Sequence, residues 1–144
     1  MPQKRRARPV DPSIAPGLVL DAGALRALER HDVALIVALR TAHQCNLPIR
    51  IPAAALAQVW RGGPRSASLA RLLKQPTAVV VVDERAARQI GEFIARLRLP
   101  NDMRADVVDA HVALTTRATK SLVWTSDPKD MASYGVEQRF IRKV

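Results

Sequence analysis

The sequence contains little sulfur and few aromatic rings. A single cysteine, Cys45, stands in 144 residues, so no disulfide can form within the chain and no oxidising compartment is required. Aromatic residues make up only 3% of the chain, whereas hydrophobic residues make up 48%. The core must therefore be built from Leu, Val, Ile and Ala, which suits helices packed on an apolar sheet. A chain of this length predicts one folded domain.

Long hydrophobic runs are also missing from the sequence. The longest ones, such as residues 33–39, are far too short to cross a bilayer. The basic start is followed by Pro9 and Pro12 instead of the apolar run of a signal peptide. We therefore expect a soluble cytoplasmic protein with no membrane partner. Residues 1–16 are expected to form a flexible basic tail, and residues 17–144 the domain.

The chain carries a large excess of positive charge. Lys and Arg number 23 against 13 Asp and Glu, which gives a formal net charge of +10. The first sixteen residues hold four cations and one acid, so the domain itself keeps +7 of this charge. A basic domain favours an anionic partner, either nucleic acid or an acidic protein, although a general effect on solubility would give the same charge.

Short apolar segments alternate with helical patterns along the whole chain. The segment 78–82 is apolar throughout, which predicts a strand that is buried on both faces of a parallel sheet. Further strands are predicted at 17–20, 48–52, 122–125 and, at the sheet edge, 137–141, with helices between them. This alternation predicts an α/β fold, a three-layer α/β/α domain whose central sheet of four to five strands is mostly parallel.

Acidic residues stand at the predicted ends of two strands and early in one helix. Asp21 follows the first strand directly, and Asp127 follows the strand 122–125 after Ser126. Asp109 lies in the apolar start of the helix before that strand, with Asp106 one turn earlier. Ligands of open parallel sheets bind beyond the carboxyl ends of the strands, so these side chains are expected to meet there. Helix capping is the alternative explanation for each aspartate taken singly.

Clustered carboxylates repel one another unless a cation holds them together. A set that is rich in Asp and poor in His and Cys suits Mg²⁺ or Mn²⁺. The three histidines, His31, His43 and His111, have no zinc-like spacing. His111 lies two residues after Asp109, on another helix face, and is interpreted as a packing or surface residue.

Four segments, in this order and with these strand contexts, resemble the motifs of PIN domains. The resemblance runs from about Gly17 to the C-terminus. The four segments are Leu20 to Leu25, Ile51 to Gly62, Asp106 to Ala113 and Thr125 to Asp130.

The resemblance implies a metal-dependent ribonuclease, and the VapC-type members of the family are toxins of toxin–antitoxin pairs. Such toxins cleave RNA, form dimers and are silenced by an antitoxin protein. Carried over to this chain, the resemblance makes Asp21, Asp109 and Asp127 catalytic metal ligands. Asp130, Asp106 and Ser126 would be their supporting neighbours.

The chain departs from the family at Gln58, where the second motif usually supplies a Glu. A glutamine offers a carbonyl oxygen but no negative charge, so the affinity for metal is expected to fall and a second metal is disfavoured. Arg61, Arg65 and Arg104 are candidates to hold the RNA backbone.

Two other functions compete with an active ribonuclease. Gln58 motivates a PIN module that binds RNA or an antitoxin without efficient cleavage. Asp83, directly after the strand 78–82, motivates a phosphoacceptor domain of the response-regulator class. That class has paired acids after its first strand, whereas Asp21 is followed here by Ala22.

Overall fold

The computed structural model describes residues 14–144. The predicted tail, residues 1–16, therefore falls almost entirely outside the described residues. The elements run β1 (Leu18–Leu20), α1 (Ala22–Glu29), α2 (Val33–Gln44), β2 (Ile49–Pro52), α3 (Ala53–Val59), the 3-10 helix η1 (Pro64–Ser66), α4 (Ala67–Leu73), β3 (Ala78–Val80), α5 (Glu84–Arg96), α6 (Val107–Thr119), β4 (Leu122–Thr125), α7 (Pro128–Ser133), the 3-10 helix η2 (Gln138–Phe140) and β5 (Ile141–Lys143).

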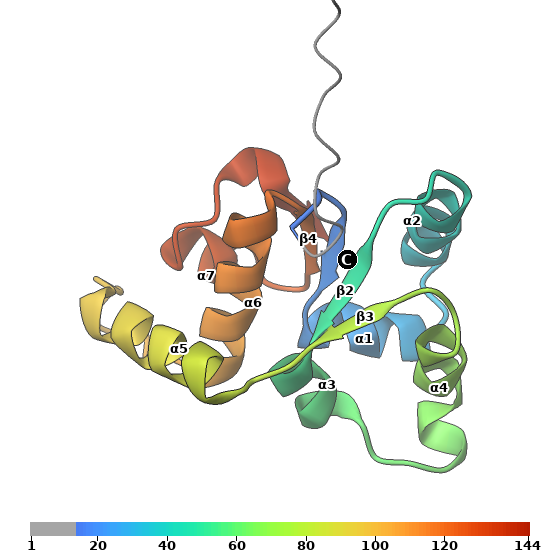
Figure 1. Ribbon diagram of the computed structural model, residues 1–144, viewed down its shortest axis with the longest axis horizontal. Helices are drawn as coiled ribbons and strands as arrows, with labels where there is room; N and C mark the ends of the chain where they lie inside the picture. The colour runs from blue at the N-terminus through green and yellow to red at the C-terminus, as the bar shows by residue number, and fades with distance from the viewer. Residues whose placement is uncertain (1–13) are drawn as a thin grey trace, which may run out of the picture.

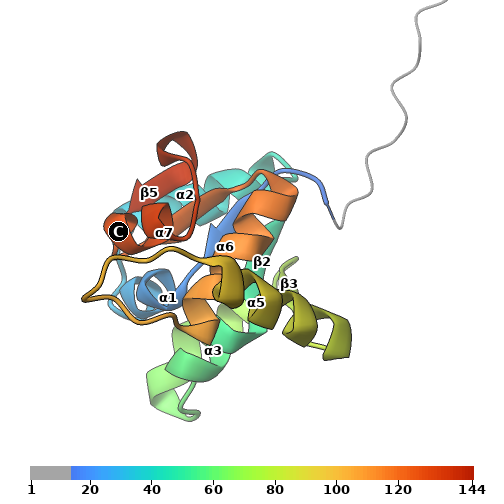
Figure 2. The same cartoon turned by 90° about the vertical axis from the view of Figure 1, so that its left-hand side faces the viewer.

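The five strands form one parallel sheet in the order β3-β2-β1-β4-β5. Helices α1, α2 and α4 lie on one face of this sheet, and α5, α6 and α7 lie on the other (Figures 1 and 2). The predicted three-layer α/β/α fold with a central parallel sheet is thus confirmed. Within residues 14–144, no helix combines the length and the apolar character that crossing a membrane takes.

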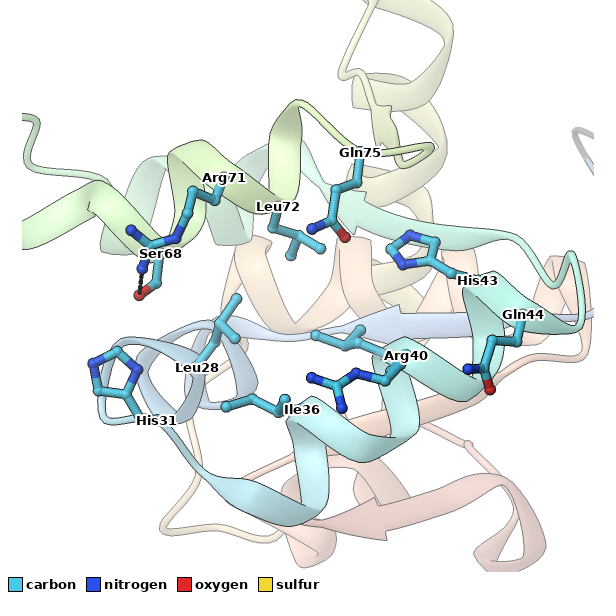
Figure 3. A pocket seen from close by; sticks show the side chains of 11 residues that line it. Leu28, His31, Ile36, Arg40, His43, Gln44, Ser68, Arg71, Leu72 and Gln75 are labelled. Carbon is cyan, nitrogen blue, oxygen red and sulfur yellow. Dashed lines mark hydrogen bonds between the residues drawn. The ribbon is translucent and has the colours of Figure 1, made fainter.

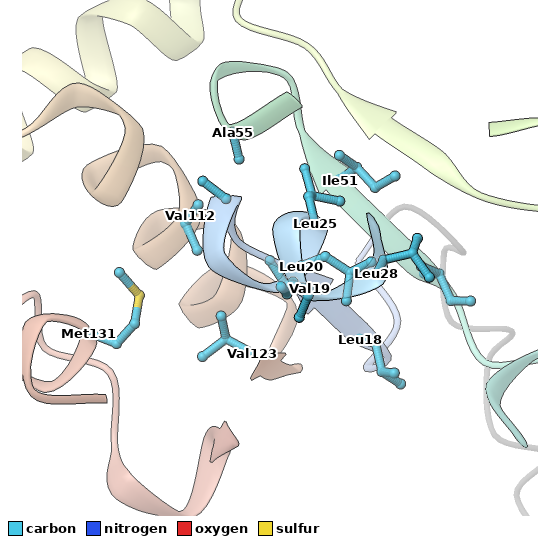
Figure 4. Packing of buried hydrophobic residues seen from close by; sticks show 14 of the residues in the cluster. Leu18, Val19, Leu20, Leu25, Leu28, Ile51, Ala55, Val112, Val123 and Met131 are labelled. Carbon is cyan, nitrogen blue, oxygen red and sulfur yellow. The ribbon is translucent and has the colours of Figure 1, made fainter. Parts of the chain in front are cut away.

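The core is centred on β1, whose three residues are all buried. Figure 4 shows the side chains of β1 between Val112 of α6 and Met131 of α7 on one side and Leu25 and Leu28 of α1 on the other. Aliphatic side chains dominate this cluster, as the scarcity of aromatic residues predicts. Because β1 is the middle strand, the residue that follows it emerges at the centre of the sheet's carboxyl edge.

The prediction that the strand 78–82 is buried on both faces is wrong. The strand covers only Ala78–Val80, and Val79, Val81 and Val82 are exposed by 40%, 64% and 40%. Two constraints explain the difference. The strand lies at the edge of the sheet, next to β2 alone, and its pairing ends where Val80 faces Pro52, the last residue of β2. The following helix, α5, also projects from the body, as Figures 1 and 2 show.

The last strand lies at the sheet edge, as predicted, but it spans Ile141–Lys143 instead of 137–141, and it pairs in parallel with β4. A parallel neighbour cannot follow directly, because the chain must first return from the carboxyl end of β4 to its start. The helix α7 and the turn η2 make that return, and pairing begins only where Ile141 meets Val123.

Gly17, at the entrance to β1, allows β1 and β2 to start side by side. A Cβ atom at Gly17 would lie 2.1 Å from the carbonyl oxygen of Pro48, a backbone atom that accepts a hydrogen bond from Leu18 N. We expect Gly17→Ala to lower the free energy of unfolding by about 2 kcal/mol, measured by urea denaturation. Gly91→Ala is the matched control, because a Cβ there meets nothing and α5 gains up to about 1 kcal/mol of helix propensity. Equal stabilities of the two variants would contradict this account of the strand entrance.

Candidate active site at the carboxyl ends of β1 and β4

Asp21 sits where β1 ends, at the centre of the sheet edge. Its backbone N–H donates to the carbonyl of Trp124 in β4 at 3.2 Å, which extends the pairing of the two strands by one residue. Its carboxylate accepts from Ala24 N at 2.7 Å and thereby caps α1. Burial raises the pKa of Asp21 in spite of the hydrogen bonds from Thr125 and the first turn of α1. A buried, oriented carboxylate therefore stands at this edge.

Asp127 and Asp130 follow the neighbouring strand, β4. The N–H of Asp127 donates to Thr125 Oγ1 at 3.0 Å, and its carboxylate accepts from Asp130 N at 3.2 Å, so Asp127 caps α7. Burial and the adjacent Asp127 raise the pKa of Asp130. The hydroxyl of Thr125 thus connects the loop of Asp127 with the carboxylate of Asp21.

The loops after β1 and β4 approach each other closely at Gly23 and Ser126. A Cβ atom on Gly23 would lie 2.1 Å from Ser126 Oγ. Gly23 is therefore required for the two strand ends to come this close. Ser126 itself is exposed beside Asp127, where the sequence placed it as a polar neighbour.

Asp106 lies at the start of α6 and acts as its cap. Its carboxylate accepts from Val108 N at 2.7 Å and from Asp109 N at 3.1 Å. Its own N–H donates to the hydroxyl of Tyr134 at 2.7 Å, and Tyr134 is only 1% exposed. Tyr134 thereby ties the start of α6 to the end of α7, a positioning role that the sequence analysis missed. The one signal in the sequence was that Tyr134 is the only tyrosine of the chain.

Asp109 is a half-buried carboxylate whose negative charge is repelled by the other aspartates at this edge of the sheet. Burial raises its pKa to about 6, with further repulsion from Asp106, Asp130, Asp21 and Asp127. Four separate chain positions therefore direct negative charge at one side chain. The capping explanation holds for Asp21, Asp106 and Asp127, but the structure shows no such cap for Asp109. Helix capping therefore explains the positions of Asp21, Asp106 and Asp127 but does not explain why Asp109 lies close to them.

The donor set suits a hard divalent cation, because carboxylate oxygens are the ligands that Mg²⁺ and Mn²⁺ prefer. Asp21, Asp106 and Asp127 each accept the backbone hydrogen bonds of a helix start through one carboxylate oxygen, Oδ1. In the described part of the chain, however, no three His, Cys, Asp or Glu side chains are grouped so that they could hold a metal ion. The residue types fit such an ion, but a bound ion would have to draw the carboxylates closer together.

The remaining predicted site residues, Gln58, Arg61, Arg65 and Arg104, show no hydrogen bond or ion pair with these aspartates within residues 14–144. Gln58 is exposed near the end of α3, a helix that packs against α1 and α6. Arg61 folds back on the same helix and donates to the carbonyls of Trp60 and Gln58 at 2.7 and 3.0 Å. Arg65 is exposed in η1, and Arg104 is exposed in the loop before α6. Their roles in binding RNA stay predictions.

Asp83, the residue behind the phosphoacceptor alternative, does not join the aspartates. It caps α5 by accepting from Ala86 N at 2.8 Å and is exposed. Its strand, β3, is separated from β1 by β2. The structure therefore gives it the role of a helix cap at the far edge of the sheet.

A basic hollow of about 460 Å³ lies between α1, α2 and α4, apart from the aspartates. Figure 3 shows Arg40 and His43 of α2 facing Leu72 of α4 and Gln75, which follows α4, across it. Its lining contains arginines and histidines but no carboxylate. This face of the described domain therefore contributes to the positive charge that the composition revealed.

Comparisons with known proteins give a structural likeness and no sequence match. No protein-family model matches the chain, and no curated protein matches it in sequence. Among solved structures, it is similar to a chain in the crystal structure of VapBC2 from Rickettsia felis bound to a DNA fragment from their promoter. The TM-score is 0.62 at 14% sequence identity, and the match covers 88% of this chain and 98% of that one. The likeness shows a shared fold.

The raised pKa of Asp109 leads to a prediction about stability. Because the folded protein binds the proton of this carboxyl more tightly than the unfolded chain does, folding loses stability as the pH rises from about 4 through about 6. Above that range, in the presence of a chelator, Asp109→Asn is expected to raise the free energy of unfolding by about 1 to 2 kcal/mol, a figure reduced for partial exposure. Near pH ~4 the gain should vanish.

Urea denaturation at the two pH values measures this difference. Asp102→Asn, at an exposed position in the loop before α6, is the control and should change stability little at either pH. A loss of stability in Asp109→Asn at neutral pH would contradict the inferred repulsion.

Proposed function

We propose that this protein is a metal-dependent endoribonuclease of the VapC type, the toxin of a toxin–antitoxin pair. The observation that carries the proposal is that Asp21, Asp106, Asp127 and Asp130 all lie near enough to the half-buried Asp109 to add their repulsion to the burial that raises its pKa. The fold shared with a chain of the VapBC2 structure supports it. So does the net charge of +10, which suits a polyanionic substrate.

In this proposal Asp21, Asp109 and Asp127 hold Mg²⁺ or Mn²⁺. Such an ion, when bound, lowers the pKa of a water molecule and stabilises charge that develops on the phosphate. The chain supplies the orientation. The caps of α1 and α7 fix Asp21 and Asp127, and the bond from Asp106 to Tyr134 fixes the start of α6 and with it Asp109. Ser126, in the loop after β4, and Asp130, in the first turn of α7, flank Asp127.

The partners follow from the same proposal. RNA is the substrate, held through Arg61, Arg65 and Arg104, which are all exposed. An antitoxin protein is the regulator, which is supported by the similarity to a chain of VapBC2 bound to a DNA fragment from their promoter. A homodimer and a cytoplasmic location complete the proposal.

A cleavage assay on total RNA in Mn²⁺ tests the activity. Asp21→Asn is expected to reduce cleavage by more than about a hundredfold, because it removes a metal ligand. Gln58→Glu is expected to raise activity about tenfold by adding a carboxylate to the site. Gln138→Glu, exposed in η2, adds the same charge away from the aspartates and should change nothing.

The outcomes separate the two forms of the proposal. Cleavage that persists unchanged in Asp21→Asn would reject metal-dependent catalysis by this chain. A silent wild type together with an active Gln58→Glu variant would favour the inactive module that Gln58 motivates.

Salt titration of RNA binding tests the proposed substrate contact. The logarithm of the affinity should fall linearly with the logarithm of the salt concentration, because Lys and Arg release the counterions of phosphates. Arg65→Gln is expected to reduce the slope by about 1, whereas Arg30→Gln, at the exposed end of α1, should leave it unchanged. A salt-independent affinity would contradict RNA as the partner.

A further inference from the structure

Trp60 differs from the other aromatic residues of the chain in being exposed. The sequence contains two Trp, one Tyr and two Phe, and all of them lie within the described residues. Trp60 is 40% exposed, whereas the others are half-buried or buried: Trp124, Phe93, Phe140 and Tyr134. Single apolar residues are common on protein surfaces, so the role of Trp60 depends on what surrounds it.

Trp60 lies beside the edge of the sheet at which the aspartates meet. It follows α3 directly, and α3 begins where β2 reaches its carboxyl end. This helix packs against α1, which Asp21 caps, and against α6, whose first turn contains Asp109. Figure 1 shows α3 at the end of the sheet toward which the strands point. Because α3 has only 7 residues, about 10 Å of helix, an RNA strand at the aspartates would reach Trp60.

Hydrogen bonds anchor the loop that begins with Trp60. The N–H of Trp60 donates to the carbonyl of Leu56 at 2.8 Å, and its own carbonyl accepts from the Arg61 guanidinium at 2.7 Å. The N–H groups of Arg61 and Gly62 both donate to Ser66 Oγ, at 3.0 and 3.1 Å. Ser66 is only 1% exposed. The backbone of Trp60 is therefore held in place, so a ligand that covers the ring would cost little conformational entropy.

The segment around Trp60 carries positive charge and no acid. No Asp or Glu stands between Asp32 and Asp83. The cations of this segment are Arg40, Arg50, Arg61, Arg65, Arg71 and Lys74, and all of them except Arg50 are exposed. An aromatic ring among cations suits single-stranded nucleic acid, because the cations attract the phosphates and the ring stacks on a base. This charge pattern favours RNA over an apolar protein surface as the ligand of Trp60.

We propose that Trp60 stacks on an unpaired base of an RNA strand whose phosphate lies at the aspartates. This inference rests on the proposed ribonuclease function and specifies its substrate as RNA that is single-stranded at the site of cleavage. In a duplex both faces of a base are covered by its neighbours, so the ring would find no partner. Arg65, in the same loop, shows no hydrogen bond or ion pair within residues 14–144 and is available for a phosphate.

RNA binding in a chelator, which prevents metal-dependent cleavage, tests the proposal. The two probes are a short single-stranded RNA of mixed sequence and the blunt duplex of the same sequence. Trp60→Leu keeps an apolar side chain but removes the stacking face. It should weaken binding of the single strand about tenfold or more and leave binding of the duplex unchanged. Trp60→Phe retains a ring and should keep most of the affinity for the single strand.

Leu47→Ala is the matched control for Trp60→Leu. Leu47 is 43% exposed, close to the 40% of Trp60, and it belongs to the same acid-free segment. It precedes β2 and therefore lies at the opposite end of the sheet. Its replacement should change the binding of neither RNA. The salt dependence separates stacking from charge, because Trp60→Leu removes no phosphate contact and should leave the slope of affinity against salt unchanged.

Tryptophan fluorescence gives a readout of the contact itself. A base that stacks on Trp60 should quench its emission, so the single strand should quench the wild type more than Trp60→Leu. In that variant the half-buried Trp124 is the remaining tryptophan. Equal quenching of the two proteins by the single strand would overturn the proposal.

The outcomes distinguish this inference from the proposed function. Equal binding of the single strand by the wild type and Trp60→Leu would reject stacking and leave the ribonuclease proposal intact. A wild type that binds neither RNA would reject RNA as the substrate, and stacking with it. A change in sedimentation that is specific to Trp60→Leu, together with unchanged RNA binding, would reject stacking by showing that a second copy of the chain covers Trp60.

Discussion

The mutual repulsion of carboxylates at one edge of the sheet is the constraint on which the account of this protein depends. Asp109 and four other aspartates reach that edge from the ends of β1 and β4 and from the start of α6, and the charges of the other four add to the burial that raises the pKa of Asp109. Repulsion of this kind costs stability, so a fold that retains it must gain something else from the arrangement. Coordination of a divalent cation is the gain we propose.

The fold holds these charges in place with backbone contacts. Because β1 and β4 are parallel neighbours, the residues after them leave the sheet at the same edge. Gly23 permits the two loops to touch at Ser126, and Tyr134 ties the start of α6 to the end of α7. The capping hydrogen bonds hold Asp21, Asp106 and Asp127 in place. The same aspartates can therefore cap helices and also lie close together at the sheet edge.

Sequence reasoning found the aspartates and the parallel sheet because both follow from local pattern. Asp21 comes directly after an apolar strand and Asp127 follows another after Ser126, and the topology rule then brings them to the same edge of the sheet. Sequence reasoning failed where the outcome depends on packing between residues that are far apart in the chain. The apolar run at 78–82 gives no sign that α5 will leave Val81 exposed, and nothing near Tyr134 in the chain indicates its bond to Asp106.

The most direct test of the central claim is the pKa of Asp109, measured by carboxyl NMR with and without Mg²⁺. The account predicts titration near a pKa of about 6 in the absence of a divalent cation. Addition of Mg²⁺ should lower that value, because a bound cation favours the charged form. Titration at the ordinary value of 3.8, with no response to Mg²⁺, would contradict the proposed convergence of the aspartates on a cation.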